Sequence, residues 1–177
     1  MTVQSLTNSK ELKSAISTSF DLRRRIQTIY ISSMNLHDPE ITKRCSFLDM
    51  IKLLSSKCTI NILIGECPHK IEDKYEDVAT KIKELIEDFD VNFFYHKNIH
   101  AKQILVNDRD EKIIFIGSCN FTTNALTNLY EVGLIVYVRD EDENEAYDNL
   151  LTRITNKIQT GCDRVVVDPV SNQLDWM

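Results

Sequence analysis

The sequence has few of the residues that interrupt regular structure, since only four glycines and three prolines occur among its 177 residues. It also lacks low-complexity linkers and internal repeats, and its length favours one soluble domain with a core large enough to fold unaided. The longest apolar runs, residues 113–116 and 134–138, are far below the ~18 residues that indicate a membrane span. The N-terminus lacks a basic segment followed by a hydrophobic block, so we expect no secretion signal, no membrane partner and a cytoplasmic location.

Paired cysteines and an excess of positive charge are also absent. The five cysteines form no CxxC pair and their number is odd, which favours reduced, mostly buried thiols over a disulfide framework. A net charge of −6 argues against the broad basic surface that non-specific nucleic-acid binding uses. The charges are unevenly distributed, with arginines at residues 23–25 and acidic residues at 140–143. A local basic groove therefore stays compatible with the composition.

Hydrophobic periodicity indicates helices alternating with strands in the first half of the chain and clustered strands afterwards. Helices are predicted over residues 9–20, 41–54, 72–89 and 140–160, with one or two helical turns over 121–128. Strands are predicted over residues 27–33, 58–65, 91–95, 101–107, 112–118 and 130–138. This pattern predicts a single α/β domain over residues 1–177, with a mixed, mostly parallel β-sheet and helices on both of its faces. The tail from about residue 161 fits either an edge strand or an extended arm.

The segment from residue 100 to residue 120 carries the polar residues of greatest interest. His100 and Lys102 stand two apart at the start of an apolar run, so their side chains project from the same face of a strand. Ser118 and Asn120 are also two apart, at the exit of the next predicted strand. The break at residues 108–111 has the length of a hairpin loop, and pairing of the two strands would bring these four side chains together. An imidazole, an ammonium group and two neutral hydrogen-bonding groups suit a phosphate ester.

This arrangement resembles the HxK…GSxN signature of the phospholipase D superfamily, and the order of predicted elements from about residue 10 to residue 160 fits that family as well. The acidic residue that the family places at the head of the following strand is similar to Glu131 here, within the run YEVGLI. The matching positions are His100, Lys102, Gly117, Ser118, Asn120 and Glu131.

One position departs from the family pattern. The family usually has Asp five residues after the lysine, whereas this chain has Asn107 there and Asp108 next to it. By strand alternation, position 107 points away from the face that carries residues 100 and 102. We therefore expect a supporting role for Asn107, as for Gly117, and no direct part in the chemistry.

The resemblance implies a role for each remaining residue. His100 would attack phosphorus and form a phosphohistidine, while Lys102 neutralises the non-bridging oxygens. Asn120 would act with it as a catalytic hydrogen-bond donor, and Ser118 would donate a hydrogen bond to the substrate. Glu131 would hold the second ring nitrogen of the histidine and fix its tautomer. Neither a metal nor another cofactor is required in this scheme, because lysine supplies the charge stabilisation.

The single copy of the motif implies a second subunit. Members of the family with one motif resemble half of the two-motif enzymes and assemble the site across a twofold axis. We therefore expect a symmetric homodimer in which His100 of one subunit attacks and His100 of the other protonates the leaving group.

A zinc site is a competing interpretation for the histidines. His96 and His100 are four apart, and Cys67 and His69 offer another pair of ligands, but the first pair would need a helix where the sequence predicts the approach to a strand. Cys119 lies inside the motif with its side chain opposite to those of Ser118 and Asn120, which favours a buried thiol.

Three functions fit the motif. The first is a metal-independent endonuclease acting on DNA or RNA, because the small single-motif members that this chain most resembles are mostly endonucleases. The second is a phospholipase or phosphatidyl transferase, although such members generally carry two motifs in a longer chain. The third is a binding module that has lost turnover, which Asn107 favours. We take the nuclease, with a nucleic-acid substrate, as the main hypothesis.

Overall fold

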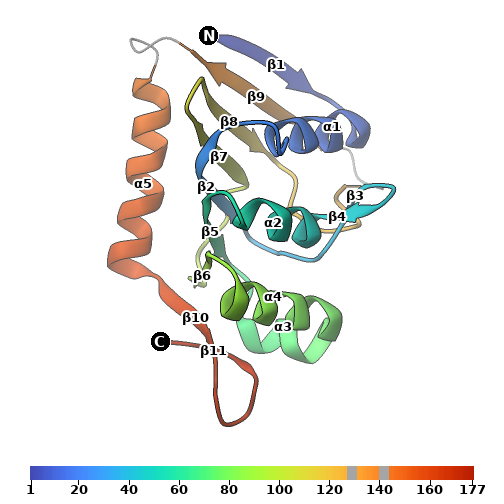
Figure 1. The fold of residues 1–177 in the computed structure, drawn as a ribbon, viewed down its shortest axis with the longest axis vertical. Helices are drawn as coiled ribbons and strands as arrows, with labels where there is room; N and C mark the ends of the chain where they lie inside the picture. The colour runs from blue at the N-terminus through green and yellow to red at the C-terminus, as the bar shows by residue number, and fades with distance from the viewer. Residues whose placement is uncertain (127–130, 140–143) are drawn as a thin grey trace.

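The fold is built on one nine-stranded sheet in the order β1-β9-β8-β7-β2-β5-β6-β10-β11, with a separate two-stranded sheet of β3 and β4 (Figure 1). The computed structural model describes residues 1–126, 131–139 and 144–177. Its strands are β1 Thr2–Leu6, β2 Ile26–Ser33, β3 Glu40–Thr42, β4 Cys45–Ser46, β5 Thr59–Ile64, β6 Val91–Tyr95, β7 Gln103–Asp108, β8 Lys112–Gly117, β9 Gly133–Val138, β10 Asp163–Val167 and β11 Leu174–Trp176. Its helices are α1 Ser9–Ser19, α2 Phe47–Ser55, α3 Pro68–Lys74, α4 Glu76–Asp88 and α5 Glu145–Gly161.

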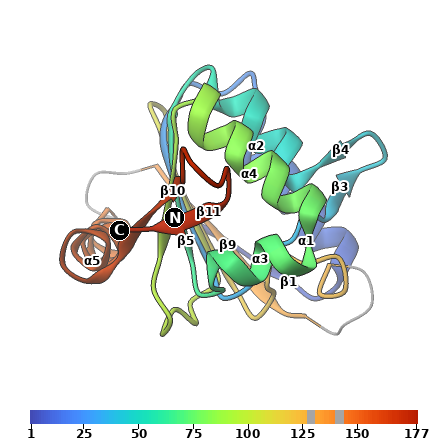
Figure 2. The ribbon, with the colours of Figure 1, turned by 90° about the horizontal axis from the view of Figure 1, so that it is seen from below.

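Helices cover both faces of the large sheet, with α1 to α4 on one side and α5 alone on the other (Figures 1 and 2). The larger apolar cluster lies on the α1–α4 side and a smaller cluster lies beneath α5. Strand β7 contributes to both, because Ile104 and Val106 enter the first cluster and Leu105 enters the second. The strand that follows His100 is therefore packed on both faces, which holds the start of that strand in a fixed position.

The prediction of a mixed sheet with helices on both faces is confirmed, but the expectation that the sheet is mostly parallel is wrong. Among the described strands, parallel pairing joins β2 to β5 and β5 to β6, and the other neighbours in the sheet pair antiparallel. The reason lies in the connections. Helical crossovers return the chain in the same direction after β2 and β5, whereas β7 and β8 are joined by a short hairpin loop.

Two predicted helices begin or end differently in the structure. The helix predicted over residues 72–89 is divided at Tyr75, whose φ of −139° and ψ of 63° separate α3 from α4. The helix predicted from residue 41 begins at Phe47, after the short strands β3 and β4. Its start is set by a capping box, in which the Ser46 side chain accepts from the Asp49 N–H and the Asp49 side chain accepts from the Ser46 N–H.

The two ends of the chain form edge strands. Strand β1 pairs antiparallel with β9 and was not predicted, because Leu6 is its single buried residue and its pattern gives no strong alternation. The tail forms β10 and β11, and β10 pairs antiparallel with β6, so an edge strand describes it better than an extended arm. Residues 121–126 form turns without a helix, and the rest of the predicted turn segment, like the start of the helix expected from residue 140, lies outside the described residues. In the part of the chain that the structure describes, no helix combines the length and apolarity needed to cross a membrane.

Candidate active site

Strand register brings the ends of several strands to one edge of the sheet. Ser32 of β2 lies opposite Gln103 at the start of β7, and Gln103 lies opposite Ile116 near the end of β8. Gly117, the last residue of β8, lies opposite Gly133, the first of β9. Residues 100–102, residues 118–120 and residue 131 flank these ends. Antiparallel pairing of β7, β8 and β9 therefore brings the segments that carry these residues to the same edge of the sheet.

Gly117 occupies a position where the two neighbouring chains approach closely. Its N–H donates to the carbonyl oxygen of Lys102 at 3.0 Å. A Cβ at this position would lie 3.1 Å from the carbonyl oxygen of Val132 and 3.3 Å from the ring of Phe115. A larger residue would push β8 away from β9, so the glycine supports the geometry of the residues that follow it.

His100 and Lys102 form the first hydrogen-bonded pair of the site. Nζ of Lys102 lies 2.9 Å from Nδ1 of His100 and 2.7 Å from the His100 carbonyl oxygen. The imidazole is exposed, whereas the lysine is only 9% exposed. Burial lowers the pKa of Lys102, and the charge of Glu131 raises it in part. An ammonium group that donates to Nδ1 requires a lone pair there, which places the proton of the neutral ring on Nε2.

Ser118 and Glu131 form the second pair. The Ser118 hydroxyl donates to Oε2 of Glu131 and accepts from the Val132 N–H at 3.2 Å. The Ser118 N–H in turn donates to the Val132 carbonyl oxygen at 3.0 Å. Glu131 is 9% exposed and acts on Lys102 through its charge. Its hydrogen-bond partner here is Ser118, and the ring nitrogen Nδ1 of His100 faces Lys102, so the expected contact between Glu131 and the histidine stays a prediction.

Asn120 is held from the end of β2, which sequence reasoning did not foresee. Its Oδ1 accepts from the Asn35 N–H at 3.5 Å. The next residue, Phe121, donates its N–H to the Ser33 hydroxyl at 3.3 Å, and Ser33 donates to the Asn35 carbonyl oxygen at 2.5 Å. The Phe121 ring is buried and stacks on Phe47, with centroids 4.7 Å apart. The polar ending of β2 was the signal available in the sequence for this support.

Asn107 and Cys119 lie outside the contacts of the two pairs. Asn107 is near the far end of β7, where its Nδ2 donates to Oε1 of Gln27 at 3.4 Å. The neighbouring Asp108 is buried and accepts from the Asp110 N–H at 2.9 Å in the hairpin turn. Cys119 is buried, and burial raises the pKa of its thiol to about 12. Such a thiol is protonated and unreactive near neutral pH.

His96 helps to position the segment that carries His100. Nδ1 of His96 accepts from the Asn98 N–H at 3.1 Å, and Lys157 of α5 places its Nζ 2.9 Å from Nε2. The contact with α5 was not visible in the sequence, because the two residues are far apart along the chain. Among the described residues, no group of three or more His, Cys, Asp and Glu side chains is placed to hold a metal ion.

Residues 12–155 match the family model described as "Cardiolipin synthase, PLD-like domain". The chain belongs to the phospholipase D superfamily. No curated protein sequence matches it. Superfamily membership supports a phosphodiesterase-type role for the chain.

Solved structures share the superfamily fold at low sequence identity. NucT from Helicobacter pylori is 15% identical with a TM-score of 0.60, over 91% of this chain and 97% of that one. Nuc from Salmonella typhimurium, a phospholipase D family member, is 16% identical with a TM-score of 0.60, over 88% of this chain and 94% of that one. Phosphatidylserine synthase from Haemophilus influenzae is 17% identical with a TM-score of 0.65, over 92% of this chain but 39% of that one.

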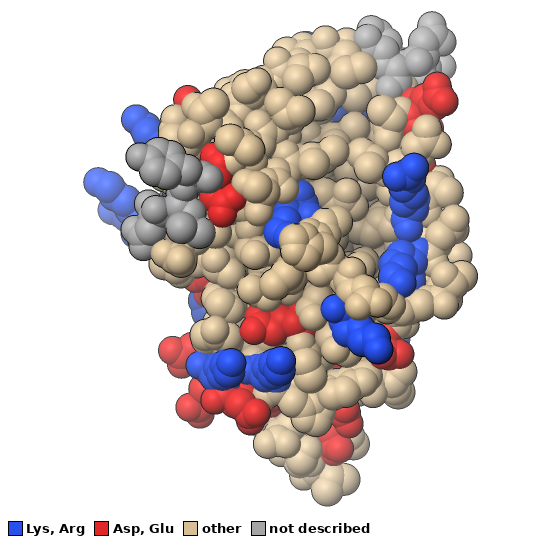
Figure 3. Space-filling view, turned by 180° about the vertical axis from the view of Figure 1, so that it is seen from behind, with Lys and Arg blue, Asp and Glu red and all other residues tan. Residues whose placement is uncertain are grey.

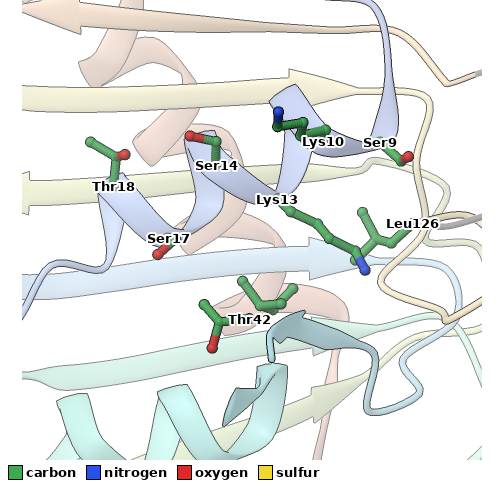
Figure 4. A pocket seen from close by; sticks show the side chains of 9 residues that line it. Ser9, Lys10, Lys13, Ser14, Ser17, Thr18, Thr42 and Leu126 are labelled. Carbon is green, nitrogen blue, oxygen red and sulfur yellow. The ribbon is translucent and has the colours of Figure 1, made fainter. Parts of the chain in front are cut away.

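A cleft opens beside the superfamily motif. It has a volume of about 590 Å³ and lies between α3, the end of β2 and the connection from β6 to β7, with His100 in its lining. That connection lies toward the rear of Figure 1 and at the lower edge of Figure 2. Seen from behind (Figure 3), basic side chains lie near the centre of the face, along its right flank and below. A second hollow of about 500 Å³ lies between α1 and β3 and contains no motif residue (Figure 4).

Proposed function

We propose that this protein is a metal-independent endonuclease that hydrolyses DNA or RNA through a phosphohistidine at His100. The observation that carries the proposal is the exposed imidazole of His100 held 2.9 Å from the buried ammonium group of Lys102. A nucleophile open to solvent beside a fixed cation meets the needs of phosphoryl transfer. The fold-level likeness to Nuc and NucT, which are of similar length, supports a nuclease over other phosphodiesterases.

The contacts define what must change when substrate arrives. Attack on phosphorus by Nε2 requires that nitrogen to be unprotonated, so the ring proton must reside on Nδ1. Lys102 must then leave Nδ1, and the non-bridging oxygens of the phosphate are its natural new partners. The N–P bond forms as the bond from phosphorus to the leaving oxygen breaks, and that oxygen takes a proton from an acid. Water then gives a proton to the deprotonated form of that acid and attacks phosphorus, and the P–N bond breaks to free the imidazole.

We propose that His100 of a second subunit is this acid. Exposed apolar side chains next to the site support a homodimer, with Ile116 43%, Val132 61% and Leu134 45% exposed. Ile116 and Leu134 are cross-strand partners, and the three residues flank Ser118 and Glu131 along β8 and β9. A contiguous apolar surface at this place fits a second copy of the same chain, because a twofold interface there brings the two sites together.

A mixing experiment tests the shared site. Wild-type protein is incubated with about a tenfold excess of His100→Ala protein until subunits exchange. Random pairing then leaves roughly a tenth of the wild-type subunits in wild-type dimers, so activity per wild-type subunit should fall to about that level. Activity that stays constant at every ratio, with a monomer mass in sedimentation, would show that one subunit suffices.

The chemistry is tested with single-stranded and double-stranded DNA and RNA in excess EDTA. Cleavage should persist in the chelator and disappear in the His100→Ala variant, and acid-labile phosphate on the trapped protein should map to His100. Cleavage that requires a divalent cation would reject the proposal.

A second candidate is a phospholipase or phosphatidyl transferase. It is favoured by the description of the matching family model and by the likeness to phosphatidylserine synthase, although this chain spans 39% of that enzyme. Release of headgroup from phosphatidylcholine, without cleavage of nucleic acid, would select it. Intact dimers inactive in both assays would select a binding module instead.

A further inference from the structure

The cleft beside His100 gathers lysines that the proposed chemistry does not use. Lys70 and Lys74 come from α3, and Lys97 comes from the connection between β6 and β7. All three side chains are exposed and line the same cleft as the histidine. Three cations around one cleft stand out in a chain with a net charge of −6.

These three lysines form no ion pair with any residue that the structure describes, unlike several lysines elsewhere on the surface. Lys52 binds Glu84, Lys81 binds Asp38 and Asp49, Lys83 binds Glu72, and Lys112 binds Asp148. Glu66 is the acidic residue in the lining of the cleft, and its Oε2 lies 3.5 Å from Nε2 of His37. The lining therefore has a net positive charge that is available to an anionic ligand.

The remaining lining supplies hydrogen-bonding groups and an aromatic ring. Asn35 and Asn98 line the cleft with neutral amide groups. Tyr95 lines it as well, and its ring packs against Trp176 of β11 with centroids 5.5 Å apart. The hairpin of β10 and β11 thus supports the Tyr95 ring at the side of the cleft. Unpaired bases stack on such rings, while bases within a duplex are already stacked on one another.

The size of the cleft limits what can enter it. A volume of about 590 Å³ lies in the range that holds a drug-sized molecule, which is comparable to one or two nucleotides. A double helix is too wide to enter such a space and would contact its rim only. Single strands, in contrast, bind in grooves that combine basic side chains with aromatic ones.

We propose that this cleft binds the nucleotides next to the scissile phosphate of a single-stranded nucleic acid. Lys70, Lys74 and Lys97 bind the flanking phosphates, and one unpaired base packs against Tyr95. This inference rests on the proposed nuclease function, since it names the substrate class of the same site.

The proposal is tested by comparing how tightly two double variants bind a single strand. Lys70→Ala/Lys74→Ala removes two cations from the cleft, and Lys10→Ala/Lys13→Ala removes two from α1 beside the other hollow (Figure 4). Both are made in His100→Ala protein, so that a labelled strand of about 12 nucleotides stays intact during an anisotropy titration at several salt concentrations. The cleft variant should bind about tenfold more weakly, and the negative slope of its log K against log salt should become smaller in magnitude by about 1.4, or 0.7 per lysine. The α1 variant should retain the parent slope. Equal slopes in all three proteins, or an equal loss in the α1 variant, would overturn the proposal.

Strand preference is tested with the matched duplex and with Tyr95→Leu. The parent should bind the single strand more tightly than the duplex, and Tyr95→Leu should lose about fivefold or more on the single strand, as expected for one stacked base. A thermal melt of the variant verifies its fold. Tighter binding of the duplex would overturn the assignment of a single strand.

A small diester separates this inference from the proposed function. Bis(p-nitrophenyl) phosphate has a single phosphate and lacks the flanking phosphates that these lysines are proposed to bind, so Lys70→Ala/Lys74→Ala should hydrolyse it at the wild-type rate while cutting oligonucleotides with a raised KM. Loss of both activities to the same degree would place the lysines in general support of the fold and overturn the inference. A wild-type protein that hydrolyses neither substrate would reject the proposed function. The salt slopes would still show whether the cleft binds single-stranded nucleic acid.

Discussion

The two hydrogen-bonded pairs of the site differ in the sign of the charge that they bury and in the way they are held. In the first, the exposed imidazole of His100 forms a hydrogen bond with the buried ammonium group of Lys102, and both residues precede β7. In the second, the hydroxyl of Ser118 binds the buried carboxylate of Glu131, and the two residues lie at the ends of neighbouring strands. Each pair thus joins an exposed residue to a buried charge, which is a cation in the first pair and an anion in the second.

In the proposed mechanism, this difference separates the reacting groups from the groups that tune them. His100 is accessible to a phosphate, and Lys102 beside it can exchange Nδ1 for a non-bridging oxygen. Glu131 cannot approach a phosphate without repulsion, but its charge keeps the pKa of Lys102 from falling as far as burial alone would lower it. We therefore expect substitutions in the first pair to abolish activity and substitutions in the second to change its pH dependence.

His100→Ala should have the largest effect. Without a nucleophile no phosphohistidine forms, and loss of a nucleophile typically lowers kcat by about 10⁴-fold or more. Initial rates on a labelled oligonucleotide in EDTA measure it, with circular dichroism to verify the fold. Because the side chain is exposed, stability should be unchanged. More than a hundredth of the wild-type rate in a preparation free of contaminating nuclease would remove His100 from the chemistry.

Lys102→Met should have the second-largest effect on activity. It retains the length of the side chain and removes the cation, and the loss of one group that stabilises transition-state charge lowers kcat by about 10²–10³-fold. Lys112→Met is the matched control, since Lys112 lies at the opposite end of the neighbouring strand β8 and binds Asp148. The control should keep nearly full activity. Equal losses in both variants would show that the effect comes from the sheet and not from the site.

Much of the first pair was predictable from the sequence, because its two members are two residues apart on one strand and no tertiary information is needed to place them together. The same holds for Gly117 and Ser118, whose motif is local. The hydrogen-bond partner of Glu131 was harder to predict. Strand register joins it to Ser118 across β8 and β9, and the contact expected with His100 stays a prediction.

Contacts between distant segments account for what the sequence did not reveal. Ser33 and Asn35 hold the motif loop from the end of β2, and Lys157 of α5 contacts His96 before β7. Neither contact follows from spacing, since both depend on how β2 and α5 are placed against β7. The same reason explains the error in sheet direction, because hairpin or crossover connections, and not strand patterns, decide whether neighbours run parallel.

Glu131→Gln should have a smaller effect that appears mainly in the pH profile. The amide can still accept from the Ser118 hydroxyl, but the negative charge that raises the pKa of Lys102 is removed. The pKa of the lysine should therefore fall further, and its ammonium group should lose the proton at a lower pH. In a plot of log kcat/KM against pH, the alkaline limb should move to lower pH. A limb that stays in place, or that moves to higher pH, would show that Glu131 does not act on Lys102.

Asn107→Asp should have the smallest effect, although it restores the residue that the family usually has. Position 107 lies five residues beyond Lys102, which is about 17 Å along an extended strand at 3.3–3.4 Å per residue. Its side chain binds Gln27 and contacts neither pair. A new carboxylate there would lie opposite Lys112, its cross-strand partner on β8, so the variant should change kcat by less than about twofold and raise the free energy of unfolding slightly. Oligonucleotide cleavage measures kcat, and urea unfolding measures the free energy of unfolding. A gain of tenfold or more in kcat would mean that the far end of β7 controls the first pair, and that the sign of the buried charge does not by itself separate reacting groups from tuning groups.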